Sequence, residues 1–128
     1  MAYRNDLNKD IASATSLAPA ARTATANGTG VDLQGFGASM VVWNVGAITD
    51  GTHTPTLQES ADNSTFTTVA ASDMSGAFAA LAANTNQEVG YIGRSRYVRA
   101  VVTVTGSPST GGVYAALIVR GRARTLPQ

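Results

Sequence analysis

Residues 97–105 read YVRAVVTVT, and this stretch decides the fold class. Successive side chains of a β-strand point to opposite faces, so residues two apart share a face. Here one alternate set is entirely apolar, whereas the other holds an arginine and two threonines. The apolar set is Val98, Ala100, Val102 and Val104, and the polar members of the other set are Arg99, Thr103 and Thr105. The pattern predicts a strand with one buried face.

A second strong strand signal, ASMVVWNV, covers residues 38–45. Val41, Trp43 and Val45 share one face, and Met40 and Val42 share the other. Apolar side chains on both faces are typical of a strand buried on both sides. We therefore predict a central strand that is covered on each face.

The other segments are short and separated by turn residues. A hairpin is expected from 54–60 and 65–70 around Ala61-Asp62-Asn63-Ser64, and residues 72–84 favour a packed loop with one helical turn. The remaining strands are expected at 23–26, 88–92 and 113–120, with turns at Asn27-Gly28 and Asp50-Gly51. Seven or eight such strands predict an all-β, antiparallel β-sandwich with a jelly-roll-like topology.

The first 22 residues have a different pattern. Leu7, Ile11, Ala14 and Leu17 recur at helical spacing, and Pro19 would end such a helix. A helix of about three turns is marginal alone in water. The prediction is therefore an N-terminal arm over residues 1–22, which docks on a neighbour or on its own domain, and a β-sandwich domain over residues 23–128. A frayed tail is the alternative for the arm.

Composition limits the class of protein. The 128 residues suit one domain, and the chain has no cysteine for disulfides or thiolate metal sites. No apolar run reaches the roughly 18 residues that span a bilayer, and the polar N-terminus does not resemble a signal peptide. We therefore expect a protein made and used without secretion, with no membrane partner. Charged residues are only 13% of the chain, which suits a surface packed against neighbours.

Charge is distributed unevenly along the chain. Residues 1–88 contain three basic and eight acidic residues, a net charge of −5, whereas residues 89–128 contain six arginines and no acid, a net charge of +6. An acidic partner surface is one reading of this polarity. Pairing of these arginines with the chain's own acids is the other. The alternating Arg120, Arg122 and Arg124 favour a protein carboxylate over nucleic acid, because no aromatic residues are interleaved with them.

No catalytic or metal motif stands out. The single histidine, His53, is interpreted as a turn residue, and Asp50, Asp62 and Asp73 as residues that bind backbone N–H groups in turns. Serine–histidine catalysis and most zinc sites need a histidine with a suitably placed partner. No enzyme activity and no cofactor are therefore expected. A second reading treats four aromatic residues as a sugar platform: Trp43, Tyr91, Tyr97 and Tyr114.

Four sequence segments, in this order, resemble segments of small structural proteins of tailed-phage virions. They are VDLQGFGASMVVWNVGAITDGTHTPTLQESADNSTFTTV (31–69), ASDMSGAF (71–78), YIGRSRYVRAVVTVTG (91–106) and GGVYAALIVRGRAR (111–124). The resemblance covers about residues 23–124 and contains no catalytic motif. It implies a jelly-roll-like sandwich and a capsid decoration, or cement, protein that is made in the host cytoplasm and placed on the virion surface.

The expected function is therefore to bind and stabilise the assembled lattice of the major capsid protein, as a homo-oligomer. The alternatives are a carbohydrate-binding module of a virion fibre or spike, and a head–tail neck or connector protein. The residues expected at protein interfaces are Leu7, Ile11, Leu17, Arg94, Arg96, Arg99, Arg120, Arg122 and Arg124.

Overall fold

A computed structural model of the chain describes residues 7–123. Its elements are α1 (Leu7–Asp10), β1 (Ile11–Arg22), β2 (Ala26–Asn27), β3 (Val31–Asp32), β4 (Phe36–Ile48), β5 (Thr52–Ser60), β6 (Thr67–Thr68), the 3-10 turn η1 (Ala71–Asp73), β7 (Met74–Ser75), β8 (Asn86–Tyr91), β9 (Tyr97–Thr105) and β10 (Gly112–Ala123). No helix within these residues is long and apolar enough to cross a membrane.

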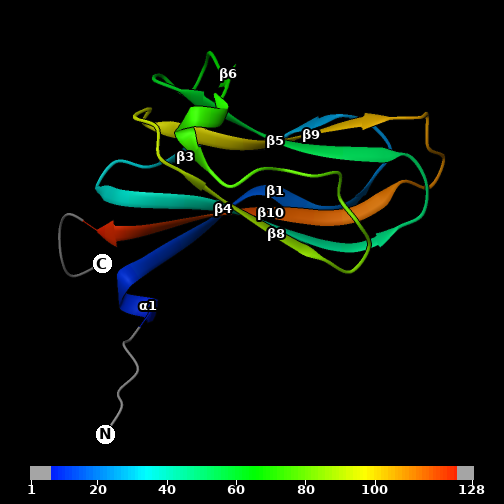
Figure 1. The fold of residues 1–128 in the computed structure, drawn as a ribbon, viewed down its shortest axis with the longest axis horizontal. Coiled ribbons are helices and arrows are strands. Elements are labelled where there is room, and N and C mark those ends of the chain that lie inside the picture. The colour runs from blue at the N-terminus through cyan, green and yellow to red at the C-terminus, as the bar shows by residue number, and fades with distance from the viewer. Residues whose placement is uncertain (1–6, 124–128) are drawn as a thin grey trace, which may run out of the picture.

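The strands form two antiparallel sheets that pack face to face, which confirms the predicted all-β, antiparallel β-sandwich. Sheet A has the order β1-β10-β4-β8-β7, and sheet B has the order β2-β9-β5-β6, with β3 also paired to β9. Figure 1 shows sheet A as the lower layer and sheet B as the upper layer, with α1 standing below the body.

The core lies between the sheets and follows the predicted alternation. Trp43 and Val41 of β4 are fully buried, and so are Ala100 and Val102 of β9. The Trp43 ring meets the Tyr114 ring of β10 edge to face, with centroids 6.1 Å apart. Aromatic pairs of this geometry add about 0.5–1.5 kcal/mol to the effect of burial.

The helix predicted at the N-terminus is wrong beyond Asp10, because Ile11–Arg22 is a strand paired to β10. The helical spacing was misleading because the pairing register shifts between Thr15 and Leu17. This bulge turns both Ser16 and Leu17 inward, at 4% and 3% exposure. Residues 11–22 are thus an integral part of sheet A.

The other predicted strands are present, but they begin and end at somewhat different residues. β5 pairs with β6 as the predicted hairpin, and its turn is closed by Asp62, whose Oδ1 accepts the N–H groups of Ser64 and Thr65. Residues 72–84 contain the end of η1, β7 and a loop. The first strand of sheet B, predicted at 23–26, begins instead at Ala26.

His53 is not a turn residue, as its sequence context suggested. It is the second residue of β5 and is 1% exposed. Its Nδ1 lies 2.8 Å from the Tyr114 hydroxyl, and its Nε2 lies 3.0 Å from the carbonyl oxygen of Asp50. Both ring nitrogens therefore have hydrogen-bond partners within the protein, and His53 is a buried structural residue.

Candidate functional site

Charged side chains gather at one end of the sandwich. Arg94 and Arg96 lie in the loop between β8 and β9, and Arg120 lies near the end of β10. We call these three residues and Asp32 the arginine end. At the opposite end, the loops over residues 49–51 and 106–111 carry one charged residue, Asp50.

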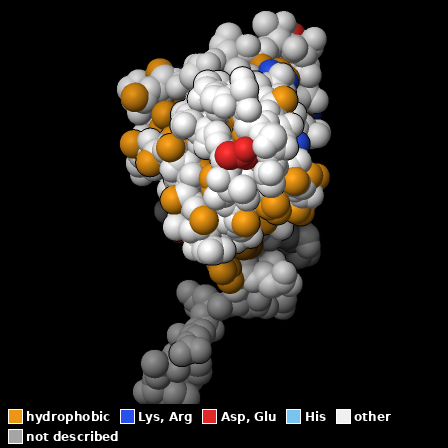
Figure 2. Space-filling model, turned by 90° about the vertical axis from the view of Figure 1, so that its right-hand side faces the viewer, with side chains coloured by type: hydrophobic (Ala, Val, Ile, Leu, Met, Phe, Trp, Pro, Cys, Tyr) orange, Lys and Arg blue, Asp and Glu red, His pale blue; other side chains and the backbone are white. Residues whose placement is uncertain are grey.

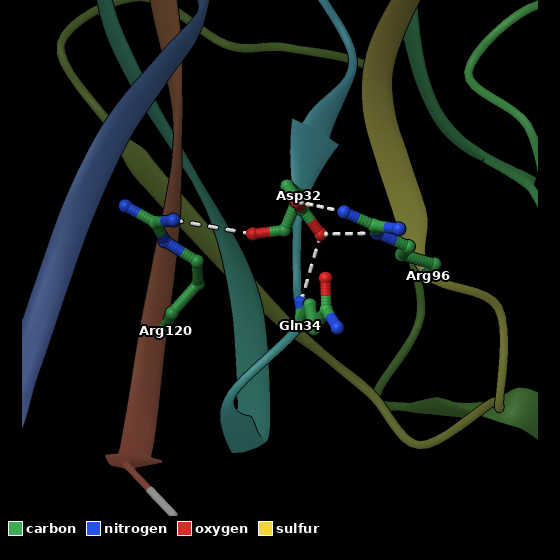
Figure 3. Close-up of polar contacts among 4 residues, drawn as sticks. All are labelled: Asp32, Gln34, Arg96 and Arg120. Carbon is green, nitrogen blue, oxygen red and sulfur yellow. Dashed lines mark hydrogen bonds and ion pairs between the residues drawn. The ribbon is translucent and has the colours of Figure 1, made fainter. Parts of the chain in front are cut away.

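Asp32 at the end of β3 organises the arginine end (Figure 3). Arg96 donates from Nε to Oδ1 at 2.9 Å and from Nη2 to Oδ2 at 2.8 Å. The backbone N–H of Gln34 donates to the same Oδ1 at 2.9 Å. Arg120 reaches across from sheet A and donates from Nη1 to the carbonyl oxygen of Asp32 at 3.1 Å. One residue therefore connects the β8–β9 loop, the β3–β4 loop and β10.

These contacts favour the charged forms of both partners. The Arg96 hydrogen bond, followed by the Gln34 N–H, lowers the pKa of Asp32 to about 2. The same hydrogen bond raises the pKa of Arg96. Their side chains are 46% and 41% exposed for Arg96 and Asp32 respectively, so water and salt screen the pair. The pair orients the loop more than it stabilises the fold.

Beside these residues lies an open hollow with a volume of about 390 Å³. Two segments line it, residues 33–39 and residues 91–96 with the exception of Ile92. Gly35, Gly37 and Gly93 leave backbone exposed on its walls. Arg94 lines the same hollow, is exposed, and donates to no acceptor among residues 7–123.

Tyr91 anchors the loop that forms one wall of the hollow. Its hydroxyl donates to Glu59 Oε1 at 2.6 Å and accepts the Ser95 N–H at 2.9 Å. Ser95 Oγ donates to the same Glu59 oxygen at 3.2 Å. Burial, and then the hydrogen bond to Glu59, raise the pKa of Tyr91. The hydroxyl therefore stays protonated as a donor, and the wall is held in place.

The site offers binding groups rather than reactive ones. Its walls present backbone amides, serine hydroxyls and the Arg94 guanidinium, which suit an acidic or polar protein segment. Within the described residues no three His, Cys, Asp or Glu side chains are grouped as a metal site. His53 lies at the opposite end, where Thr49 pairs with Gly111.

The structure brings together three of the predicted interface arginines, Arg94, Arg96 and Arg120. Arg99 is separate: it donates to Gln58 Oε1 at 2.9 and 2.7 Å, and its guanidinium lies 4.1 Å from the Phe66 ring centre on the outer face of sheet B. Arg96 pairs with the chain's own Asp32, as the second reading predicted, whereas Arg94 has no acidic partner among residues 7–123 and the acidic partner surface stays a prediction.

The remaining predicted contact residues differ in whether they reach the surface. Leu7 is 64% exposed on α1, and Ile11 is half-buried at the start of β1. Leu17 is wrong as a contact residue, because the bulge in β1 places it in the core at 3% exposure. Arg122 belongs to β10, and Arg124 lies outside the described residues.

The sequence predicted that β4 is covered on both faces, and this prediction is wrong for the described residues. β4 is central in sheet A, yet only one of its faces is covered within residues 7–123. Met40 and Val42 point away from the core and stand opposite Val119 and Leu117 of β10, all four half-buried. We call these four residues the outer apolar face. Figure 2 shows apolar side chains along the lower side of the body, which is the side of sheet A.

The expected sugar platform is not formed. Trp43, Tyr91 and Tyr114 are 0%, 5% and 1% exposed, so their rings are not available for stacking. Tyr97 is half-buried, and the Arg96 guanidinium lies 5.0 Å from its ring centre.

No protein-family model matches this chain, and comparison with curated proteins gives no match. Its functional assignment therefore rests on the residues and geometry described above.

Proposed function

We propose that this protein is a decoration protein of a tailed-phage virion, which binds the assembled lattice of the major capsid protein and stabilises it. The proposal treats the molecule as an adhesive module and not as an enzyme. Three observations support it: the order of the four sequence segments, the sandwich fold, and the surface formed by the outer apolar face of sheet A and the arginine end.

The outer apolar face is the observation that carries the proposal. Four branched or flexible apolar side chains, Met40, Val42, Leu117 and Val119, stand side by side at the middle of a sheet. Polar residues flank them: Ser13 and Thr15 on β1, and Glu88 on β8. An apolar centre with a polar rim is the usual anatomy of a protein interface.

The strand pairing supports a jelly-roll connectivity. β1 pairs with β10, β2 and β3 pair with β9, β4 pairs with β8, and β5 pairs with β6. The pairs are nested along the chain, the outermost strands with each other and the innermost with each other. Eight-stranded double-sheet folds of this kind occur in viral capsid proteins and in lectins, so the fold alone does not choose between them.

Stabilisation would follow from mass action. A protein that binds the assembled lattice but not the free subunit shifts the equilibrium toward the lattice. A homo-oligomer that engages several subunits at once gains further through effective concentration. Arg94, which lines the hollow without an internal acceptor among the described residues, is the residue best placed to meet a capsid carboxylate.

Two alternatives make different predictions. A neck or connector protein would be present in about a dozen copies per virion, whereas a decoration protein would be present in hundreds, so quantitative gel analysis of virions separates them. A carbohydrate-binding module has less support, because three of the four aromatic residues proposed for stacking are buried.

The direct test adds the purified protein to expanded capsids of the phage that encodes it, followed by sedimentation. Val42→Lys should reduce the amount bound by about fivefold or more, because it places a charge at the centre of the outer apolar face. Thr103→Lys on the exposed face of β9 is the matched control and should bind normally. Failure of the unaltered protein to bind capsids would contradict the proposal.

A further inference from the structure

The edges of the two sheets are protected unequally. Sheet B ends at β2, β3 and β6, each of two residues, and sheet A ends on one side at β7, also of two residues. Very short edge strands are a common protection against unwanted strand pairing. The remaining edge of sheet A is β1, which has 12 residues and no charged side chain before Arg22.

The second half of β1 is closed by other means. Register shifts follow Thr15, and Pro19 cannot donate a backbone hydrogen bond. The carbonyl oxygen of Ser16 accepts the N–H of Thr29 at 2.6 Å, so a loop of the same chain covers this part. Residues 11–15 have none of these protections. They pair with β10 in unbroken register, and no strand within residues 7–123 occupies their other side.

We propose that the open stretch Ile11–Thr15 pairs with the same stretch of a second copy of this chain. The contact joins two copies of sheet A into one continuous antiparallel sheet across a two-fold axis. The axis passes beside Ser13, the centre of the open stretch, so that Ser13 faces Ser13 of the partner copy and Ile11 faces the partner's Thr15. Addition of a strand to an exposed sheet edge is a common mode of protein recognition.

The chemistry of the stretch suits a second copy. A two-fold contact joins the same stretch of both copies, so a charge at the axis would face an identical charge. The stretch IASAT contains no charge, and its side chains at 12, 13 and 14 are small enough for close approach. Alternate residues of an edge strand turn both N–H and C=O away from their own sheet, and an identical antiparallel strand satisfies both.

The geometry also extends the interface beyond the strand. Ile11, Ser13 and Thr15 lie on the outer side of sheet A, opposite Gly121, Val119 and Leu117 of β10. Pairing about Ser13 therefore aligns the outer apolar faces of the two copies as one surface. A five-residue strand contact is small compared with the roughly 1,000 Å² of a stable interface, so a weak dimer is expected.

A charge-exchange experiment tests the register. Ser13 is exposed, so Ser13→Lys and Ser13→Glu should each leave the fold intact. Each variant alone should raise the dimer dissociation constant by about fivefold or more in sedimentation velocity, because like charges would face each other directly. An equimolar mixture of the two variants should restore dimers. Variants that dimerise as the unaltered protein does, or a mixture that stays monomeric, would overturn the proposed pairing.

Cross-linking gives an independent readout, because the chain contains no cysteine. Ser13→Cys should form a disulfide-linked dimer on mild oxidation, since facing residues of paired strands bring their Cβ atoms to about 5 Å. Thr103→Cys, at an exposed position of β9, is the control and should react slowly. Equal rates for the two variants, or a protein that is monomeric even at millimolar concentration, would refute the dimer without affecting the capsid proposal.

Discussion

Asp32 contacts three segments that are distant in sequence, and its charge state determines how firmly they are joined. The carboxylate accepts two hydrogen bonds from Arg96 and one from the Gln34 N–H, while its backbone carbonyl accepts from Arg120. Protonation of the carboxylate would remove the ion pair and leave the Arg120 contact in place. The loop that forms one wall of the hollow would then lose this anchor and keep others, among them the Tyr91 hydroxyl and the Leu33 N–H, which donates to the carbonyl oxygen of Arg96 at 2.7 Å.

This dependence predicts a specific effect of pH. The pKa of Asp32 is about 2 in the folded protein and about 4 in the unfolded chain, so the unfolded chain binds the proton more tightly. The stabilisation is therefore complete above about pH 4 and is lost as the pH falls toward 2. Asp32→Asn should lower the free energy of unfolding at pH 7 by less than about 1 kcal/mol, because the pair is exposed. Urea unfolding at several pH values measures the difference.

The comparison with Asp32→Asn isolates this residue from the other acids. Asp50 and Asp62 also have lowered pKa values, through backbone N–H groups of Gly111 and Thr65 respectively, but both are present in the two proteins and their contributions cancel. The difference in unfolding free energy between the proteins should therefore shrink as the pH falls from about 4 and disappear below about pH 2. A difference that does not change with pH would show that the asparagine acts through packing.

β1 is the element in which local sequence and tertiary structure disagree. Its apolar residues have helical spacing, yet it pairs with β10 from Ile11 to Arg22, with two shifts of register on the way. Ser16 explains why the strand is needed: its Oγ accepts the N–H of Ala100 at 2.9 Å and donates to the carbonyl oxygen of Thr29 at 2.8 Å. The strand thus forms one edge of sheet A and also links sheet A to sheet B.

Two truncations separate the strand from the segment before it. Deletion of residues 1–10 removes only α1 from the described structure and should change the melting temperature little. Deletion of residues 1–22 removes β1, exposes the edge of β10 and leaves the Ala100 N–H buried without its acceptor. The shorter chain should fail to fold cooperatively, as measured by circular dichroism and thermal unfolding. A shorter chain that melts normally would show that β1 is dispensable, as a separate arm would be.

β9 and β1 show which parts of the fold can be predicted from the sequence. β9 was predictable because its alternation is regular and its inward residues are all apolar. β1 was not, because a bulge breaks its alternation and its register is set by β10, which lies about 100 residues later in the chain. The arginine end was predictable in composition but not in geometry, since Asp32 and Arg96 are 64 residues apart. Tyr91 and Glu59, 32 residues apart, left no sequence signal.

Across the whole molecule, charge and apolar surface occupy different places. The arginine end carries Arg94, Arg96 and Arg120 with the acid Asp32, and Glu59 lies beside them, while Arg22 and Asp50 lie at the opposite end. The outer apolar face lies on sheet A, between these ends. Arg94 has no acceptor among residues 7–123, whereas Arg22 donates to the carbonyl oxygen of Ala18. In the proposed capsid complex, a carboxylate that pairs with Arg94 while the outer apolar face is covered would give the bound molecule a defined orientation.

The dependence of capsid binding on salt tests this orientation. Arg94→Ala should weaken binding by about fivefold at low ionic strength and by little at high ionic strength, because an exposed charge pair is screened by salt. Arg99→Ala removes the same charge from the outer face of sheet B, where Arg99 is held by Gln58, and should leave binding unchanged once its folding is verified. Equal losses for the two variants would show that only net charge matters. In that case the arginine end would have no special part in attachment.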